Sequence, residues 1–107
     1  MHRRAFLTSV LTLAAVARAA TAQDEPRYPN AGPGHFVKET RESGRFVVLE
    51  DKSVWEITER NRYVTAAWQE FEGISVRFAD GDPPYTYELT NVDRDEGAAA
   101  RWVKPER

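Results

Sequence analysis

The chain has 107 residues, of which 41% are hydrophobic and 30% charged, with 15 Lys and Arg against 17 Asp and Glu. A chain of this length holds one small domain. It contains no cysteine, which excludes disulfides, thiolate metal sites and thiol catalysis. No run approaches the roughly 18 to 20 consecutive apolar residues of a spanning helix, so a polytopic membrane protein is excluded as well.

Residues Met1–Ala22 have the basic start, apolar middle and small-residue end of a cleaved export signal helix. Ala20 and Ala22 occupy the two positions at which a signal peptidase accepts only small side chains. We expect the cut before Gln23, with a cut after Ala19 as the second choice. The mature chain then keeps 15 - 3 = 12 basic residues against 17 acidic ones. The resulting net charge of -5 disfavours nucleic acid and anionic membrane surfaces as partners.

The start of this segment also resembles the twin-arginine export motif. Arg3 and Arg4 are followed, after one residue, by Phe6-Leu7, and Arg18 places a further positive charge near the cleavage site. An ordinary Sec signal that begins with two arginines is the alternative reading. Either way we expect a periplasmic or secreted protein without a transmembrane anchor in its mature form. We expect no lipid anchor either, since no cysteine is available for lipidation.

The next segment, residues 23–34, is poor in core residues and contains three prolines and two glycines. This composition predicts a flexible or extended arm. Residues 35–107 remain as the folded domain. A domain this short buries only about 60% of its unfolded surface, so its stability should rest on a few large side chains.

Six segments have the period-2 alternation, or the β-branched and aromatic content between turn residues, that is typical of strands. They are Phe36–Arg41, Phe46–Leu49, Val54–Thr58, Ile74–Phe78, Tyr85–Thr90 and Ala98–Val103. Polar turns at residues 50–53 and 80–83 predict two hairpins. Helical and strand patterns compete in Arg60–Phe71, and we favour a strand there because Tyr63, Val64 and Thr65 are poor helix formers.

About six or seven short strands at roughly ten-residue spacing predict an all-β fold. A small barrel is the economical architecture because closure removes exposed strand edges. An SH3-like barrel, an OB-like barrel and a two-sheet sandwich all fit the sequence.

Two stretches resemble a group of small exported bacterial β domains of unknown function. Leu49-Glu50-Asp51-Lys52-Ser53-Val54-Trp55 is similar to that group's Leu-x-Asp-Gly-Ser-x-Trp turn, and Tyr85–Asn91 is similar to its Tyr-x-Tyr-x-Leu-x-Asn strand. This chain departs from the group at Lys52, where the group tends to have glycine. The resemblance covers about half of the chain and implies fold and location only.

Residues for catalysis are scarce. His35 is the only histidine left after cleavage, and a lone histidine at a strand start is more typical of a surface residue than of a catalyst or a metal ligand. The acidic turn at residues 93–97 superficially resembles the start of an EF-hand loop, but its glycine falls in the wrong place. We therefore expect no catalytic residue, metal or cofactor.

Aromatic residues are the remaining candidates for function. Trp55 and Tyr87 are expected in the core, whereas Trp68, Tyr85 and Trp102 lie near predicted strand ends and suit ligand contact equally well. We expect a monomeric, non-enzymatic binding or accessory protein of the bacterial cell envelope, whose partner is an envelope protein or glycan. A small envelope-acting hydrolase, or an enzyme inhibitor that uses surface carboxylates, is the alternative.

Overall fold

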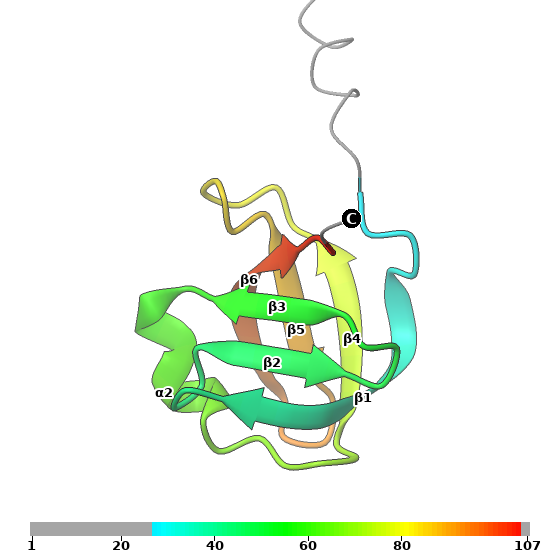
Figure 1. The fold of residues 1–107 in the computed structure, drawn as a ribbon, viewed down its shortest axis with the longest axis vertical. Coiled ribbons are helices and arrows are strands. Elements are labelled where there is room, and N and C mark those ends of the chain that lie inside the picture. Colours follow the sequence, from blue (N-terminus) through cyan, green and yellow to red (C-terminus); the bar gives the residue numbers. More distant parts are fainter. Residues whose placement is uncertain (1–26, 106–107) are drawn as a thin grey trace, which may run out of the picture.

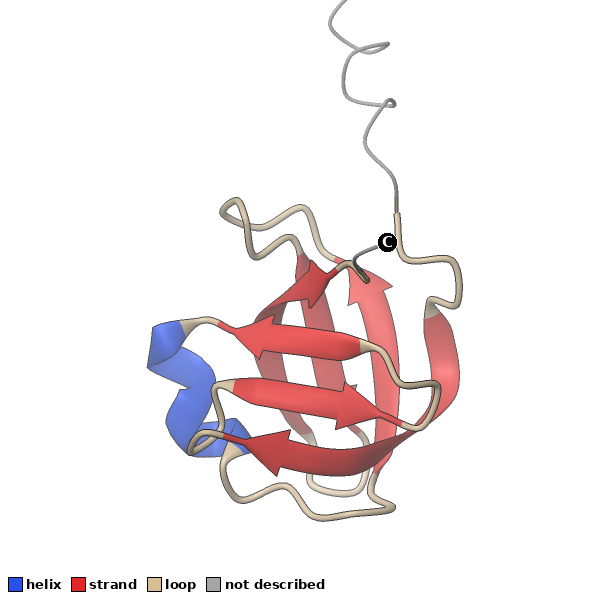
Figure 2. Cartoon of the chain, viewed as in Figure 1, coloured by secondary structure: helices blue, strands red, loops and turns tan. Residues whose placement is uncertain are grey.

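A computed structural model describes residues 27–105 of the chain (Figure 1). These residues form strands β1 (Gly32–Arg41), β2 (Phe46–Leu49), β3 (Val54–Ile57), β4 (Gly73–Phe78), β5 (Tyr87–Asn91) and β6 (Glu96–Val103). A 3₁₀ turn η1 (Glu59–Asn61) leads directly into the short helix α2 (Arg62–Thr65). Figure 2 shows the strands curving around a common axis, with the helical segment on one side.

The strands pair antiparallel in the order β1-β2-β3-β6-β5-β4, and the pairing of β4 with β1 closes the barrel. This closure confirms the expected small all-β barrel and excludes the two-sheet sandwich. Both expected hairpins are present, since β2 pairs with β3 and β4 pairs with β5. The pairing of β1 with β2 shifts register between Val37 and Glu39, and such an irregularity bends a strand.

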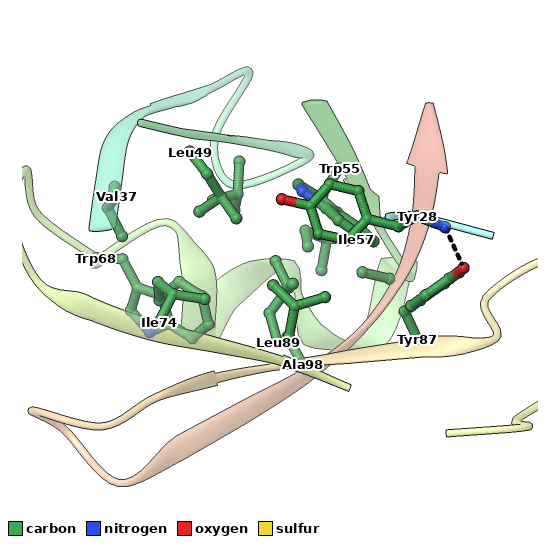
Figure 3. Close-up of a cluster of buried hydrophobic side chains, with 13 residues drawn as sticks. Tyr28, Val37, Leu49, Trp55, Ile57, Trp68, Ile74, Tyr87, Leu89 and Ala98 are labelled. Carbon is green, nitrogen blue, oxygen red and sulfur yellow. Dashed lines mark hydrogen bonds between the residues drawn. The ribbon is translucent and has the colours of Figure 1, made fainter. Parts of the chain in front are cut away.

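Inward-facing residues of the strands fill the barrel (Figure 3). Leu49, Trp55, Ile57 and Leu89 have no exposed surface. Trp55 lies at the centre of an aromatic cluster, with its ring centroid 4.9 Å from that of Tyr28 and 5.2 Å from that of Tyr87. The core therefore depends on a few large side chains, as expected for so small a domain.

The middle segment corrects one prediction, because residues 60–71 form no strand. Thr65 is fully buried and its Oγ1 donates to the carbonyl of Gly44 at 2.7 Å, so α2 docks on the turn between β1 and β2. A Cβ atom at Gly44 would lie 2.2 Å from the carbonyl oxygen of Arg62. This close approach, rather than local helix propensity, stabilises a helical turn in a sequence of poor helix formers.

The structure places part of the predicted flexible or extended arm against the barrel. Tyr28 is only 5% exposed and belongs to the core, its backbone N–H donates to the hydroxyl of Tyr87 at 2.9 Å, and β1 begins at Gly32. The buried ring of Tyr28 therefore anchors this proline-containing segment on the barrel. We call residues 27–31 the N-terminal strap.

The export signal, including Arg3, Arg4, Ala20 and Ala22, lies outside the described residues. Among residues 27–105, no helix is long and apolar enough to cross a membrane.

Candidate functional site

Two grooves flank the loop that joins β4 to β5, residues 79–86. The first groove has a volume of about 530 Å³ and lies over the outer face of β4, β5 and β6. The second groove has a volume of about 370 Å³ and lies between the loop and the end of β6. Both are large enough for a small ligand or a few residues of a larger one.

The floor of the first groove is made of small residues of β6. Gly97 and Ala99 line it beside Glu88, the cross-strand partner of Ala99. A Cβ atom at Gly97 would lie 2.7 Å from Oε2 of Glu88, so only glycine lets this carboxylate lie across the strand. The result is an open floor with an acidic side chain on it.

Polar groups surround that floor. Arg77 pairs with Glu88 from the neighbouring strand, and Arg60, Asp82 and Tyr85 also line the groove. The wall at η1 is fixed in place because Asn61 Oδ1 accepts from the backbone N–H of Ala99 at 2.9 Å. The groove therefore offers positively charged donors and negatively charged acceptors beside the ring of Tyr85.

The second groove has a different chemistry. Among the described residues, its lining contains the cations Arg101 and Lys104 and no acidic side chain. The rest of the lining is largely apolar and includes Trp102, Tyr87 and two prolines of the loop. This groove is therefore suited to a group that combines negative charge with apolar surface.

Glu56, on the outer face of β3, fixes the position of Arg101. It is only 8% exposed, and its Oε1 accepts from Nη2 of Arg101 at 2.6 Å, while Arg45 donates to Oε2 at 3.2 Å. Hydrogen bonds from Arg101 lower the pKa of Glu56, burial opposes this effect, and Arg45 adds to the lowering. A carboxylate held ionised in this way orients the guanidinium at the edge of the second groove.

The structure separates the three aromatic residues that we singled out. Trp68 is 3% exposed and packs in the core, where its Nε1 donates to Oε1 of Glu96 at 2.9 Å. Tyr85 lines the first groove and Trp102 lines the second. Only Tyr85 and Trp102 are therefore placed where a ligand could reach them.

A third cluster holds the N-terminal strap and was missed by sequence reasoning. Nδ1 of His35 lies 2.9 Å from Oε2 of Glu50, and Nε2 lies 2.7 Å from the carbonyl oxygen of Asn30. Both partners are acceptors, so both ring nitrogens donate and the imidazolium is the fitting form. Burial lowers the pKa of His35, but the carbonyl of Asn30 and the carboxylate of Glu50 outweigh it and raise the pKa above its ordinary value.

Asp51 fastens the other side of the strap. It accepts from the hydroxyl of Tyr28 and from both the backbone N–H and the hydroxyl of Ser53, at 3.0 Å and 2.6 Å. Partial burial raises the pKa of Asp51, but these hydrogen bonds outweigh it and lower the pKa to about 2. No sequence signal links residue 28 to residue 51, because the contact exists only in the folded chain.

His35, Glu50 and Asp51 bring three ligand-type atoms within 4.8 Å of one another. Each of these side chains is already used inside the chain, since Glu50 Oε1 also accepts from the backbone N–H of Phe36 at 2.9 Å. A metal ion would have to displace these bonds. The cluster is therefore better suited to fastening the strap than to holding an ion.

Comparisons of the chain with protein-family models, with curated proteins and with solved structures found no match.

Proposed function

We propose that this chain is an exported, non-enzymatic binding or accessory module of the bacterial cell envelope. Its first groove would take a polar ligand there, either a glycan or a segment of an envelope protein. The observation that carries the proposal is the groove of about 530 Å³, in which charged and amide side chains converge beside Tyr85.

The composition of the groove favours binding of a polar ligand. Arg77 and Glu88 offer planar donors and acceptors, and Tyr85 offers a ring face, which together suit sugar hydroxyls or peptide groups. The cross-strand pairing of Arg77 with Glu88 holds both side chains on neighbouring strands of the barrel. Groups that are ordered before binding lose less conformational entropy when the ligand arrives.

Four groups that could otherwise perform acid–base chemistry are engaged outside this groove. His35 uses both ring nitrogens to hold the N-terminal strap. Asp51, Glu56 and Glu72 have lowered pKa values because donors surround them, whereas a general acid at neutral pH needs a raised one. A hydrolase that used surface carboxylates would depend on Asp82 and Glu88 in the first groove.

A site-specific crosslinking experiment tests this function. A photoreactive phenylalanine analogue replaces Tyr85 in the full chain, which is exported and irradiated in intact cells. The control places the same analogue at Tyr63, which is 80% exposed and does not line the groove. We expect one envelope component to crosslink at position 85 and not at position 63.

Equal capture at both positions, or capture at neither, would contradict binding in this groove. If the chain turns over the captured component and Glu88→Gln abolishes this turnover, the hydrolase would be supported instead.

Location is tested separately. Replacing Arg3 and Arg4 together by lysine should leave the precursor in the cytoplasm, because twin-arginine export needs the arginine pair. Unchanged export of this variant would show that the signal is of the Sec type. Cytoplasmic retention of the chain with its natural signal would contradict the envelope location itself.

A further inference from the structure

At the second groove, β6 extends beyond the strand that it pairs with. In the ladder between β5 and β6, Tyr87 lies opposite Ala100, and β5 begins at Tyr87. The sequence pattern predicts that this strand begins at Tyr85. Because it begins two residues later, the last part of β6 has no paired strand on this side among the described residues.

Backbone N–H and C=O groups point alternately to the two edges of a strand, and this alternation decides which residues of β6 leave theirs unpaired. Thr58 donates its N–H to the carbonyl of Ala99 at 3.0 Å, so Ala99 directs its backbone groups toward the β3 side. Successive residues of a strand direct their N–H and C=O groups to opposite edges of that strand. Ala100 and Trp102 therefore direct theirs toward β5.

For Ala100 this brings a partner, Tyr87. For Trp102 it brings no backbone partner among residues 27–105. The ladder with β5 ends at Tyr87, Tyr85 donates its own N–H to Asp82, and no backbone hydrogen bond joins Trp102 to the loop. Trp102 thus presents one N–H and one C=O at an open strand edge, which is the feature that extended peptides pair with.

The charge around this edge is positive. Arg101 gives its Nε and one Nη2 donor to Glu56, and its Nη1 makes no hydrogen bond among the described residues. Lys104 lies on the same groove. The ion pairs around Glu56 form a cluster of three arginines and two glutamates, which therefore keeps a net positive charge. Its members are Arg45, Arg62, Arg101, Glu42 and Glu56. In a mature chain with 12 basic and 17 acidic residues, this is a local reversal of charge.

We propose that the second groove binds an extended segment of a partner protein that carries an acidic side chain. The segment pairs with the N–H and C=O of Trp102, its carboxylate binds Arg101 and Lys104, and its neighbouring side chain packs on Trp102 and the prolines of the loop. The open strand edge favours a peptide over a glycan, because a sugar cannot continue a β ladder. This site does not depend on a ligand in the first groove.

Titration of the ¹⁵N-labelled full chain with short peptides tests this inference. The probe is an acetylated, amidated pentapeptide, Thr-Glu-Val-Glu-Thr. We expect it to shift the backbone amide signals of Trp102, Lys104 and Thr86. The same peptide with Gln in place of Glu should bind about tenfold more weakly, the value of one charge-assisted hydrogen bond. Methylation of the central amide nitrogen should weaken it by a similar factor, because the donor to Trp102 is lost.

Two matched lysine variants distinguish binding in the second groove from a general effect of the protein's net charge. Lys104→Gln should weaken the peptide about threefold, as for a charge at the rim of a site, and exposed Lys38→Gln should leave it unchanged. Arg60→Gln, in the first groove, should also leave it unchanged. If the first groove binds no ligand, the expected binding of the peptide to the second groove is therefore unchanged.

Several results would overturn the inference. They are equal affinity for the Glu and Gln peptides, equal affinity for the methylated peptide, or shifts that avoid Trp102. Equal or tighter binding of trigalacturonate, an acidic sugar, would show that the site takes glycans instead. Signals of Trp102 that move with protein concentration in the absence of peptide would indicate a second copy of the chain as the occupant.

Discussion

Two irregular segments lie at the same end of the barrel and behave in opposite ways (Figure 1). The N-terminal strap, residues 27–31, inserts Tyr28 into the core and bonds through Tyr28 and Asn30 to Asp51, Tyr87 and His35. The β4–β5 loop, residues 79–86, bonds mainly to itself, as Tyr85 does to Asp82, and leaves a groove on each side. Both segments contain proline and a tyrosine, so these residue types do not distinguish them.

The difference lies in where the tyrosine points. Tyr28 reaches Trp55 and Trp102, with ring centroids 4.9 Å and 5.5 Å away, so the strap closes that part of the barrel. Tyr85 is half-buried on the wall of a groove. Stability should therefore depend on the strap and binding on the loop, a division that substitutions can test.

The largest effect is expected from Tyr28→Ala. Removing a buried aromatic ring should lower the free energy of unfolding by about 3 kcal/mol, because the cavity forms among Trp55, Tyr87 and Trp102. Tyr85→Ala is the matched control and should cost less than about 1 kcal/mol. Urea denaturation followed by tryptophan fluorescence measures both. Equal losses would mean that the two segments do not differ in the way described.

Asp51→Asn should have the next largest effect. The change replaces a carboxylate that accepts from Tyr28 and Ser53 by an amide, and should cost about 1.5 kcal/mol at pH 7. Asp82→Asn, in the loop, should cost nothing measurable. The pKa of Asp51 is lowered from 3.8 to about 2, so its stabilisation is present above the unfolded value and is lost as the pH falls toward 2. The wild-type and Asp51→Asn unfolding curves should therefore converge in acid.

A smaller effect is expected at higher pH. The pKa of His35 is raised in the fold, so its contribution is fully present below the unfolded value of about 6.5. That contribution is lost as the pH rises through the folded-state value. The urea midpoint should accordingly fall as the pH rises above about 6.5. In His35→Gln this slope should disappear, since no other histidine follows the signal segment. If the slope persists in His35→Gln, another titrating group causes it.

How much of this could be predicted from the sequence depends on the range of the interaction. The alternation in Ile74–Phe78 predicts a strand correctly because one face of the barrel wall is buried. Residues 62–65 form a helix against their propensity because the turn at Gly44 supports it, a contact between distant parts of the chain. Tyr85 and Trp102 were predicted as ligand contacts because they lie close to predicted strand ends. The bond of Tyr28 to Asp51 was not, because nothing local encodes it.

The smallest effect is expected at Lys52, in the turn between β2 and β3. Its φ of 71° is in the left-handed region, which costs a residue with a Cβ atom about 1 to 2 kcal/mol. The turn needs this conformation because the N–H of Lys52 donates to the carbonyl of Leu49 at 2.9 Å while the N–H of Leu49 donates to the carbonyl of Ser53. Glycine, which the resembling group tends to have here, removes the strain but adds entropy to the unfolded chain. Lys52→Gly should therefore raise stability by about 0.5 kcal/mol, whereas Lys38→Gly within β1 should lower it. A loss of stability in Lys52→Gly would mean that the lysine side chain contributes more to this turn than its backbone strain costs.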